Sequence, residues 1–101
     1  MIAHNVYFTL FDNSETAVQT LLAACRKYLI DHPGIASFAC GTLAVEQARE
    51  VNDRDWDVGL HIVFIDKAAH DRYQDAAPHH QFIAESRPNW RRVRVFDTDL
   101  A

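Results

Sequence analysis

The chain has 101 residues, of which 49% are hydrophobic and 24% are charged, and its formal net charge is −4. This length and composition predict one soluble globular domain, residues 1–101, with a modest core. The interleaved acidic and basic residues argue against a general nucleic-acid-binding surface, and no run approaches the roughly 20 apolar residues of a membrane span.

The cysteines and the first residues of the chain indicate the cellular compartment in which the protein is expected. Cys25 and Cys40 show no CxxC spacing, so neither a disulfide framework nor a zinc module is expected. Both are predicted to be small core residues in a reducing cytosol. The opening segment MIAHNVYF has no basic region and no long apolar run, which predicts no signal peptide. We therefore expect a cytoplasmic protein that is not anchored in a membrane.

The first elements expected along the chain are a strand and a helix. Residues 3–11 predict a strand whose side chains point alternately to its two faces. The even-numbered set is apolar except for its histidine: His4, Val6, Phe8 and Leu10. Within residues 14–31, apolar side chains recur at helical spacing and form one stripe. Asn13 or Ser14 can cap this helix, and His32-Pro33-Gly34 ends it.

Two further strands are expected in the middle of the chain. Residues 35–46 predict a strand in which Gly41 marks a bulge. The polar residues 47–55 predict a loop or a hairpin connection. Residues 56–65 are apolar at nearly every position, which predicts a strand that is covered on both faces.

The last third predicts two short helices and a final strand. Asp66 can cap a helix from Lys67 to about Asp75. Pro78 suits a first helical turn and predicts a second helix that ends near Glu85. Residues 91–97 predict the last strand, in which the arginine cluster is expected to be solvated: Arg91, Arg92 and Arg94.

The order strand–helix–strand–strand–helix–strand is typical of the ferredoxin-like α+β fold, an antiparallel βαββαβ sheet with helices on one face. On the first strand, the expected helix-covered face is that of His4. On the later strands it holds Trp56, Val58, Leu60, Ile62, Phe64, Val93 and Val95. The opposite face combines apolar Tyr7, Phe11, Val63, Ile65 and Phe96 with polar Asn5, Thr9, Asp57, His61 and Arg94. That face is too apolar to be fully exposed to solvent, so we expect a homodimer that pairs through the sheet face.

Three side chains are candidates for acid–base chemistry. His4 is either a pocket base or donor, or a core histidine bonded to backbone or a carboxylate. Tyr73 is either a donor to a carbonyl oxygen or one more core aromatic. His79 is either a neutral base or simply exposed, as His70 and His80 are expected to be. The helix break between Tyr73 and His79 can turn both side chains over one end of the sheet.

The spacing of the histidines and glycines gives little support to a metal site or a cofactor site. His79 and His80 are adjacent, so their imidazoles diverge on a helix, and nothing resembles HExxH or a facial triad. With only 3 glycines, the chain has no glycine-rich phosphate loop. We expect no metal and no cofactor.

Several short segments together resemble the stress-responsive A/B barrel (Dabb) family. They are His4-Asn5-Val6, His61-Ile62-Val63-Phe64, Ala69-His70-Asp71-Arg72-Tyr73-Gln74, Pro78-His79-His80-Gln81-Phe82 and Val95-Phe96-Asp97. Their order and spacing cover essentially the whole chain. The resemblance implies a dimeric α+β barrel, in which two ferredoxin-like subunits face each other through their sheets.

The resemblance also implies a site. One plant member of the family is a polyketide cyclase that performs a metal-free aldol condensation with a tyrosine, a histidine six residues later, and a nearby first-strand histidine. Tyr73, His79 and His4 match those positions, and Phe82 matches a pocket aromatic. This chain departs where a second pocket histidine corresponds to Val58 and helix aromatics are replaced by smaller residues such as Cys25. The Pro78-His79 turn can also be structural, with the histidine capping a helix or bonding the last strand near Asp97.

Our leading hypothesis is a pocket between sheet and helices that binds a small aromatic or carbonyl compound. Its catalytic groups would be Tyr73, His79 and His4, and its apolar wall would be Val6, Phe8, Val58, Leu60, Phe82, Val93 and Val95. The alternative is a stress-response or interaction domain without enzymatic activity. A third possibility is a barrel monooxygenase, which shares the architecture, although a fold does not by itself define a function.

Overall fold

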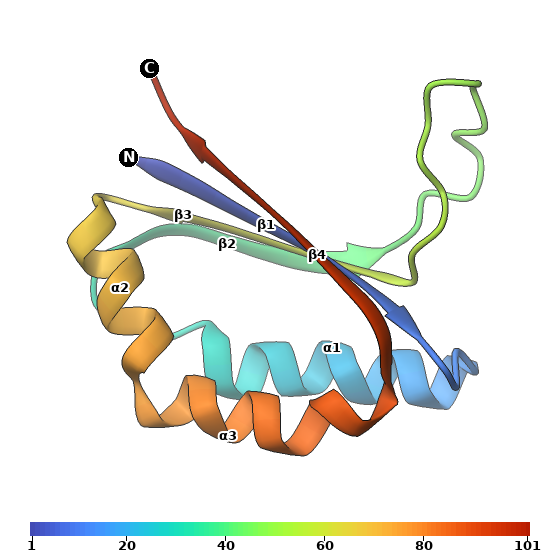
Figure 1. Ribbon diagram of the computed structural model, residues 1–101, viewed down its shortest axis with the longest axis horizontal. Coiled ribbons are helices and arrows are strands. Elements are labelled where there is room, and N and C mark those ends of the chain that lie inside the picture. Colours follow the sequence, from blue (N-terminus) through green and yellow to red (C-terminus); the bar gives the residue numbers. More distant parts are fainter.

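A four-stranded antiparallel sheet forms one layer of the protein, and helices form the other (Figure 1). The computed structural model describes residues 1–101. The elements are β1 (Ile2–Leu10), α1 (Glu15–Leu29), β2 (Ile35–Thr42), β3 (Val58–Phe64), α2 (Lys67–Asp75), α3 (Ala77–Ser86), a 3-10 turn (Arg87–Asn89) and β4 (Trp90–Asp99). The strand order is β2-β3-β1-β4. The ferredoxin-like α+β fold is confirmed.

Different parts of the chain lie against the two faces of the sheet. Helices α1 and α3 run side by side along one face, and α2 connects the end of β3 to α3 (Figure 1). The long loop of residues 43–57 projects on the opposite side of the sheet (Figure 1). None of the helices has the length and apolar character needed to cross a membrane.

The helices begin where local sequence chemistry places them. The Ser14 hydroxyl accepts a hydrogen bond from the Ala17 N–H at 3.3 Å, and the Asp66 carboxylate accepts one from the Ala69 N–H at 2.8 Å. Both bonds satisfy backbone donors that the first helical turn leaves free. Pro78 lies in the first turn of α3, where its missing N–H costs nothing. The predicted caps at Ser14 and Asp66 are therefore confirmed.

Gly34 determines how the chain enters β2 beneath α2. Its φ of +87° lies in the left-handed region, where a side chain is strained. A Cβ built on Gly34 would lie 2.4 Å from the Cβ of Ala69, which is fully buried. Glycine is needed here both for the backbone turn and for the close approach of α2.

Several predicted boundaries and one bulge are corrected by the structure. β2 ends at Thr42 rather than at residue 46, β3 begins at Val58 rather than at Trp56, and β4 extends from Trp90 to Asp99. The register of β2 against β3 shifts between Ile35 and Ser37, whereas Gly41 lies directly opposite Gly59 in regular pairing. The predicted bulge at Gly41 is wrong because the irregularity accompanies the turn that enters the strand.

The core lies between the sheet and the helices. From β1 and β3 it contains side chains at alternate positions, which are almost completely buried: Val6, Phe8, Leu10, Val58, Leu60, Ile62 and Phe64. This alternation matches the predicted helix-covered face. Trp56 was expected on that face but lies on the other one, where its ring centroid is 5.0 Å from that of Tyr7. It precedes β3, so the strand alternation does not control its direction.

The outer face of the sheet carries exposed apolar side chains. Phe96 is 52% exposed, and its ring centroid is 6.0 Å from that of Tyr7 on the neighbouring strand. Val93 and Val95 belong to the helix-covered face, but they are 38% and 50% exposed because β4 is the edge strand. The arginines of β4 are not simply solvated: Arg94 forms an ion pair with Asp53, and Arg91 and Arg92 lie 3.5 and 3.8 Å from Asp55.

Candidate functional site

A partly open cavity of about 170 Å³ lies between the sheet and α3. It is lined mostly by apolar side chains, with a few polar groups among them: His4, Val6, Phe8, Leu60, Tyr73, Gln74, His79, Phe82, Ile83, Trp90, Val93 and Val95. Nine of the ten predicted site residues are in this set. Val58 is the tenth; it is fully buried in the core and does not line the cavity.

The geometry of the helix break brings Tyr73 and His79 together. Ala76 lies between α2 and α3 and has extended backbone angles, φ −69° and ψ 145°, which turn the chain between the two helices. The ring centroids of Tyr73 and His79 are 4.8 Å apart, and those of Tyr73 and His4 are 6.0 Å apart. Three separate elements, β1, α2 and α3, thus bring His4, Tyr73 and His79 to one cavity.

Burial keeps these groups uncharged at neutral pH. Tyr73 is 2% exposed, and burial raises the pKa of its hydroxyl well above the usual range. Burial lowers the pKa of His79 to about 4, and the neighbouring His80 adds to this effect. Tyr73 therefore keeps its proton and can donate it in a hydrogen bond, whereas His79 is neutral and offers a lone pair.

His4 is held in place by Asp97. The Nδ1 atom of His4 lies 2.6 Å from Oδ1 of Asp97, and these two residues are direct partners in the β1–β4 register. A neutral His4 that donates from Nδ1 to the carboxylate has its lone pair on Nε2. Burial lowers the pKa of His4, while the hydrogen bond and the charge of Asp97 act in the opposite direction.

Like Trp90, which also lines the cavity, His79 has a buried ring nitrogen without a hydrogen-bond partner in the protein. Its Nδ1 is buried and has no partner within the protein. Its side chain does not cap α3, whose amino-terminus has no side-chain hydrogen bond, and the residue that bonds Asp97 is His4. The two structural roles considered for the Pro78-His79 turn are therefore wrong. An unpaired buried nitrogen at a cavity is a natural contact for a ligand or a water molecule.

The structure adds residues that the sequence pattern did not single out. Gln74, Ile83 and Trp90 complete the cavity wall. His70 was expected to be exposed, but its side chain is only 15% exposed and its ring centroid lies 4.9 Å from that of His4. Helical spacing is the signal that could have found it, since His70 and Tyr73 lie three residues apart on one face of α2.

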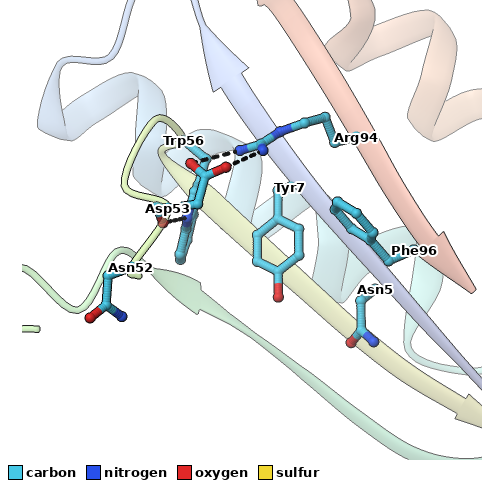
Figure 2. A pocket seen from close by; sticks show the side chains of 7 residues that line it. All are labelled: Asn5, Tyr7, Asn52, Asp53, Trp56, Arg94 and Phe96. Atoms are coloured by element: carbon cyan, nitrogen blue, oxygen red, sulfur yellow. Dashed lines mark hydrogen bonds and ion pairs between the residues drawn. The ribbon is translucent and has the colours of Figure 1, made fainter. Parts of the chain in front are cut away.

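A second cavity, of about 410 Å³, lies on the outer face of the sheet beneath the long loop. Figure 2 shows its lining, in which the ion pair between Asp53 and Arg94 ties the loop to β4. The Tyr7 ring is 5.0 Å from that of Trp56 and 6.0 Å from that of Phe96. This aromatic surface belongs to the face on which the sequence predicts a partner subunit.

The fold is similar to that of several solved proteins. A Dabb family protein with a ferredoxin-like fold from Mesorhizobium loti is 24% identical, with a TM-score of 0.82 over 99% of this chain and 96% of that one. A dimeric ferredoxin-like protein of unknown function from Thermobifida fusca is 19% identical, with a TM-score of 0.81 over 98% and 90%. A hydroxynitrile lyase from Passiflora edulis is 16% identical, with a TM-score of 0.78 over 99% and 93%.

At these identities the similarities show the fold alone. A search of curated protein sequences finds no match to this chain. The model of the stress responsive A/B barrel domain, however, matches residues 2–100. This match covers nearly the whole sequence, and the chain belongs to the Dabb family.

Proposed function

We propose that the cavity between the sheet and α3 binds a small carbonyl compound and catalyses proton transfer at the carbon beside the carbonyl group. The observation that carries this proposal is the unpartnered, buried Nδ1 of His79, next to the Tyr73 ring in a mostly apolar cavity. Such a cavity with a few convergent polar groups is the usual form of a small-molecule site.

The size of the cavity limits the ligand. Its volume of about 170 Å³ is below the ~300–1,000 Å³ that drug-sized ligands occupy. A cavity of about 150 Å³ can hold a benzene molecule. The ligand is therefore about the size of one aromatic ring with a short polar substituent, which is much smaller than a folded polyketide chain.

Each polar group has a role in the proposed proton transfer. The Tyr73 hydroxyl donates a hydrogen bond to the carbonyl oxygen, where negative charge develops. His4 accepts the proton at Nε2 as the C–H bond breaks, and Asp97 stabilises the imidazolium that forms. His79 remains neutral because of its low pKa and supplies a further polar contact to the ligand. Return of the proton from His4 completes the turnover.

Hydrogen–deuterium exchange into acetophenone tests this chemistry directly. The protein is incubated with acetophenone in D₂O, and loss of the methyl proton signal is followed by NMR beyond the buffer-catalysed rate. We expect acceleration by the wild-type protein, and less of it with Tyr73→Phe and His4→Asn. His80→Asn is the matched control, since His80 is exposed and neighbours His79. If exchange equals the buffer rate at saturating protein, the proton-transfer proposal is wrong.

Ligand binding is measured separately, so that binding without turnover is recognised. Single-ring aldehydes and ketones are screened by the shift they cause in melting temperature and by NMR line broadening. We expect the binding of at least one of them to weaken when a larger side chain fills the cavity, as in Val6→Phe. Binding that Val6→Phe does not alter would place the ligand elsewhere.

A non-enzymatic role of the same domain rests on a different observation, the apolar outer face of the sheet. Phe96 and Tyr7 lie on this face, and a solved protein of the same fold is dimeric. We infer that two copies pair through this face into a closed barrel. This pairing does not depend on the cavity, which lies on the other side of the sheet.

A further inference from the structure

We propose that His4, His70 and Asp97 together form a binding site for a divalent transition-metal ion, with Zn²⁺ as the representative ion. One potential ligand atom from each of the three side chains lies within 4.8 Å of the other two. The three residues come from β1, α2 and β4, respectively. Two imidazoles and one carboxylate, with positions left open, are a known donor set for such ions.

The two imidazoles are already held close to each other. His4 is 4% exposed, and its ring centroid is 4.9 Å from that of His70. Both rings pack edge-on against Phe64, at centroid distances of 6.3 Å for His4 and 5.4 Å for His70. The Asp66 cap defines the start of α2, and with it the position of His70 in the first turn. The sites of two of the three ligands are therefore set by packing.

The other contacts of His70 and Asp97 are weak enough for these side chains to move onto an ion. The nitrogen contacts of His70, with Asp71 and Gln74, are both 3.4 Å long and therefore weak. The Asp97 carboxylate is 42% exposed and free to adjust its position. An ion would take the place of the proton that His4 Nδ1 and Asp97 share at 2.6 Å, and that proton would move to Nε2 of His4.

The donor set predicts which ions bind. Imidazole nitrogen suits Zn²⁺, Cu²⁺, Ni²⁺ and Co²⁺, whereas Mg²⁺ and Ca²⁺ prefer oxygen ligands. Because the ion would place the His4 proton on Nε2, His4 could no longer accept a proton there. If the proposed proton transfer is correct, Zn²⁺ should therefore inhibit it. Binding itself does not depend on that activity.

Calorimetric titration of chelator-treated protein with Zn²⁺ tests the site. We expect one ion per chain. Loss of a hydrogen bond that only supports a metal ligand weakens binding by roughly 10–100-fold. We expect His70→Asn and Asp97→Asn each to weaken Zn²⁺ binding by more than this, because each removes a ligand. His80→Asn should bind like the wild type, since His80 lies outside the cluster. Mg²⁺ should not compete with Zn²⁺.

A spectroscopic measurement on the wild-type chain tests the site without relying on variants that could fold differently. Long-range ¹H–¹⁵N NMR reports each imidazole nitrogen. On addition of Zn²⁺ we expect the ring nitrogens of His4 and His70 to shift, and those of His61 to remain unchanged. The proposal is overturned if affinity is equal in wild type, His70→Asn and Asp97→Asn, or if the His4 and His70 nitrogens do not shift at saturating Zn²⁺.

Discussion

The Nδ1 of His4 and the Oδ1 of Asp97 lie 2.6 Å apart across the antiparallel pair of β1 and β4. One of these side chains is buried and the other is 42% exposed. The contact therefore joins the interior of the cavity to the solvent at the edge of the sheet. It orients the imidazole and selects its tautomer, in the way that carboxylates commonly orient histidines at catalytic and metal sites.

The first prediction concerns the protonation of His4. Because Asp97 raises the pKa of His4 against the effect of burial, Asp97→Asn should lower that pKa further. Asp99→Asn is the matched control on the same strand, since Asp99 lies opposite Ile2 rather than His4. An NMR titration of the His4 ring protons measures the effect. Equal pKa values in the two variants would show that Asp97 does not interact with His4 in solution.

The second prediction concerns the pH dependence of stability. The pKa of His79 falls from an ordinary value of 6.5 to about 4 in the folded protein, so between these values the unfolded state binds a proton that the folded state does not. The folding free energy contributed by this group is therefore fully present above about pH 6.5 and is lost as the pH falls towards 4.

Urea unfolding between pH 7.5 and 4.5 measures this dependence in chelator-treated protein. His4 and His61 also have lowered pKa values and act in the same direction, so His79→Gln should reduce the slope without abolishing it. His80→Gln is the control, because His80 is exposed. A wild-type stability that rises as the pH falls over this interval would contradict the assignment.

The third prediction separates the hydroxyl of Tyr73 from its ring. The ring packs against Phe64 at 5.0 Å and against His79 at 4.8 Å, and Tyr73→Phe retains both contacts. We expect the unfolding free energy to change by no more than about 1 kcal/mol, because the hydroxyl makes no hydrogen bond to another side chain or to the backbone. Proton exchange into acetophenone should nevertheless fall. A variant that exchanges at the wild-type rate would remove Tyr73 from the chemistry.

The fourth prediction concerns Gly34. Gly34→Ala would place a methyl group 2.4 Å from the Cβ of Ala69 at a φ of +87°. Such backbone strain alone costs on the order of 1–3 kcal/mol, and the collision with α2 adds to it. Gly41→Ala is the matched control, because a Cβ at Gly41 meets nothing within 4 Å. Urea unfolding of both variants should show a large loss of stability for Gly34→Ala only.

The fifth prediction concerns assembly. Light scattering coupled to gel filtration should give twice the chain mass, and Phe96→Glu should shift the protein towards the monomer because it places a charge on the apolar outer face. Ile30→Glu is the control: Ile30 is 47% exposed at the end of α1, on the helical side of the sheet. A wild-type chain that is monomeric at micromolar concentration would overturn the proposed pairing.

Local patterns in the sequence were sufficient for most of the fold. Alternation in β1 and β3 identified the buried face, since successive side chains of a strand point to opposite sides. Ser14, Asp66 and Pro78 marked helix starts, because the first helical turn has free backbone donors wherever it occurs. Trp56 was misplaced because it precedes β3, where the direction of a side chain depends on the loop rather than on the strand period.

The sequence by itself thus determined the order of the elements, the family and most of the cavity wall, because each depends on residue type and spacing along the chain. Only the tertiary structure decided that His4 bonds Asp97, that His70 lies against His4, and that His79 has a buried nitrogen without a partner. These relationships join β1, α2, α3 and β4. They depend on strand register and on the packing of helices over the sheet, which bring together groups far apart in the chain.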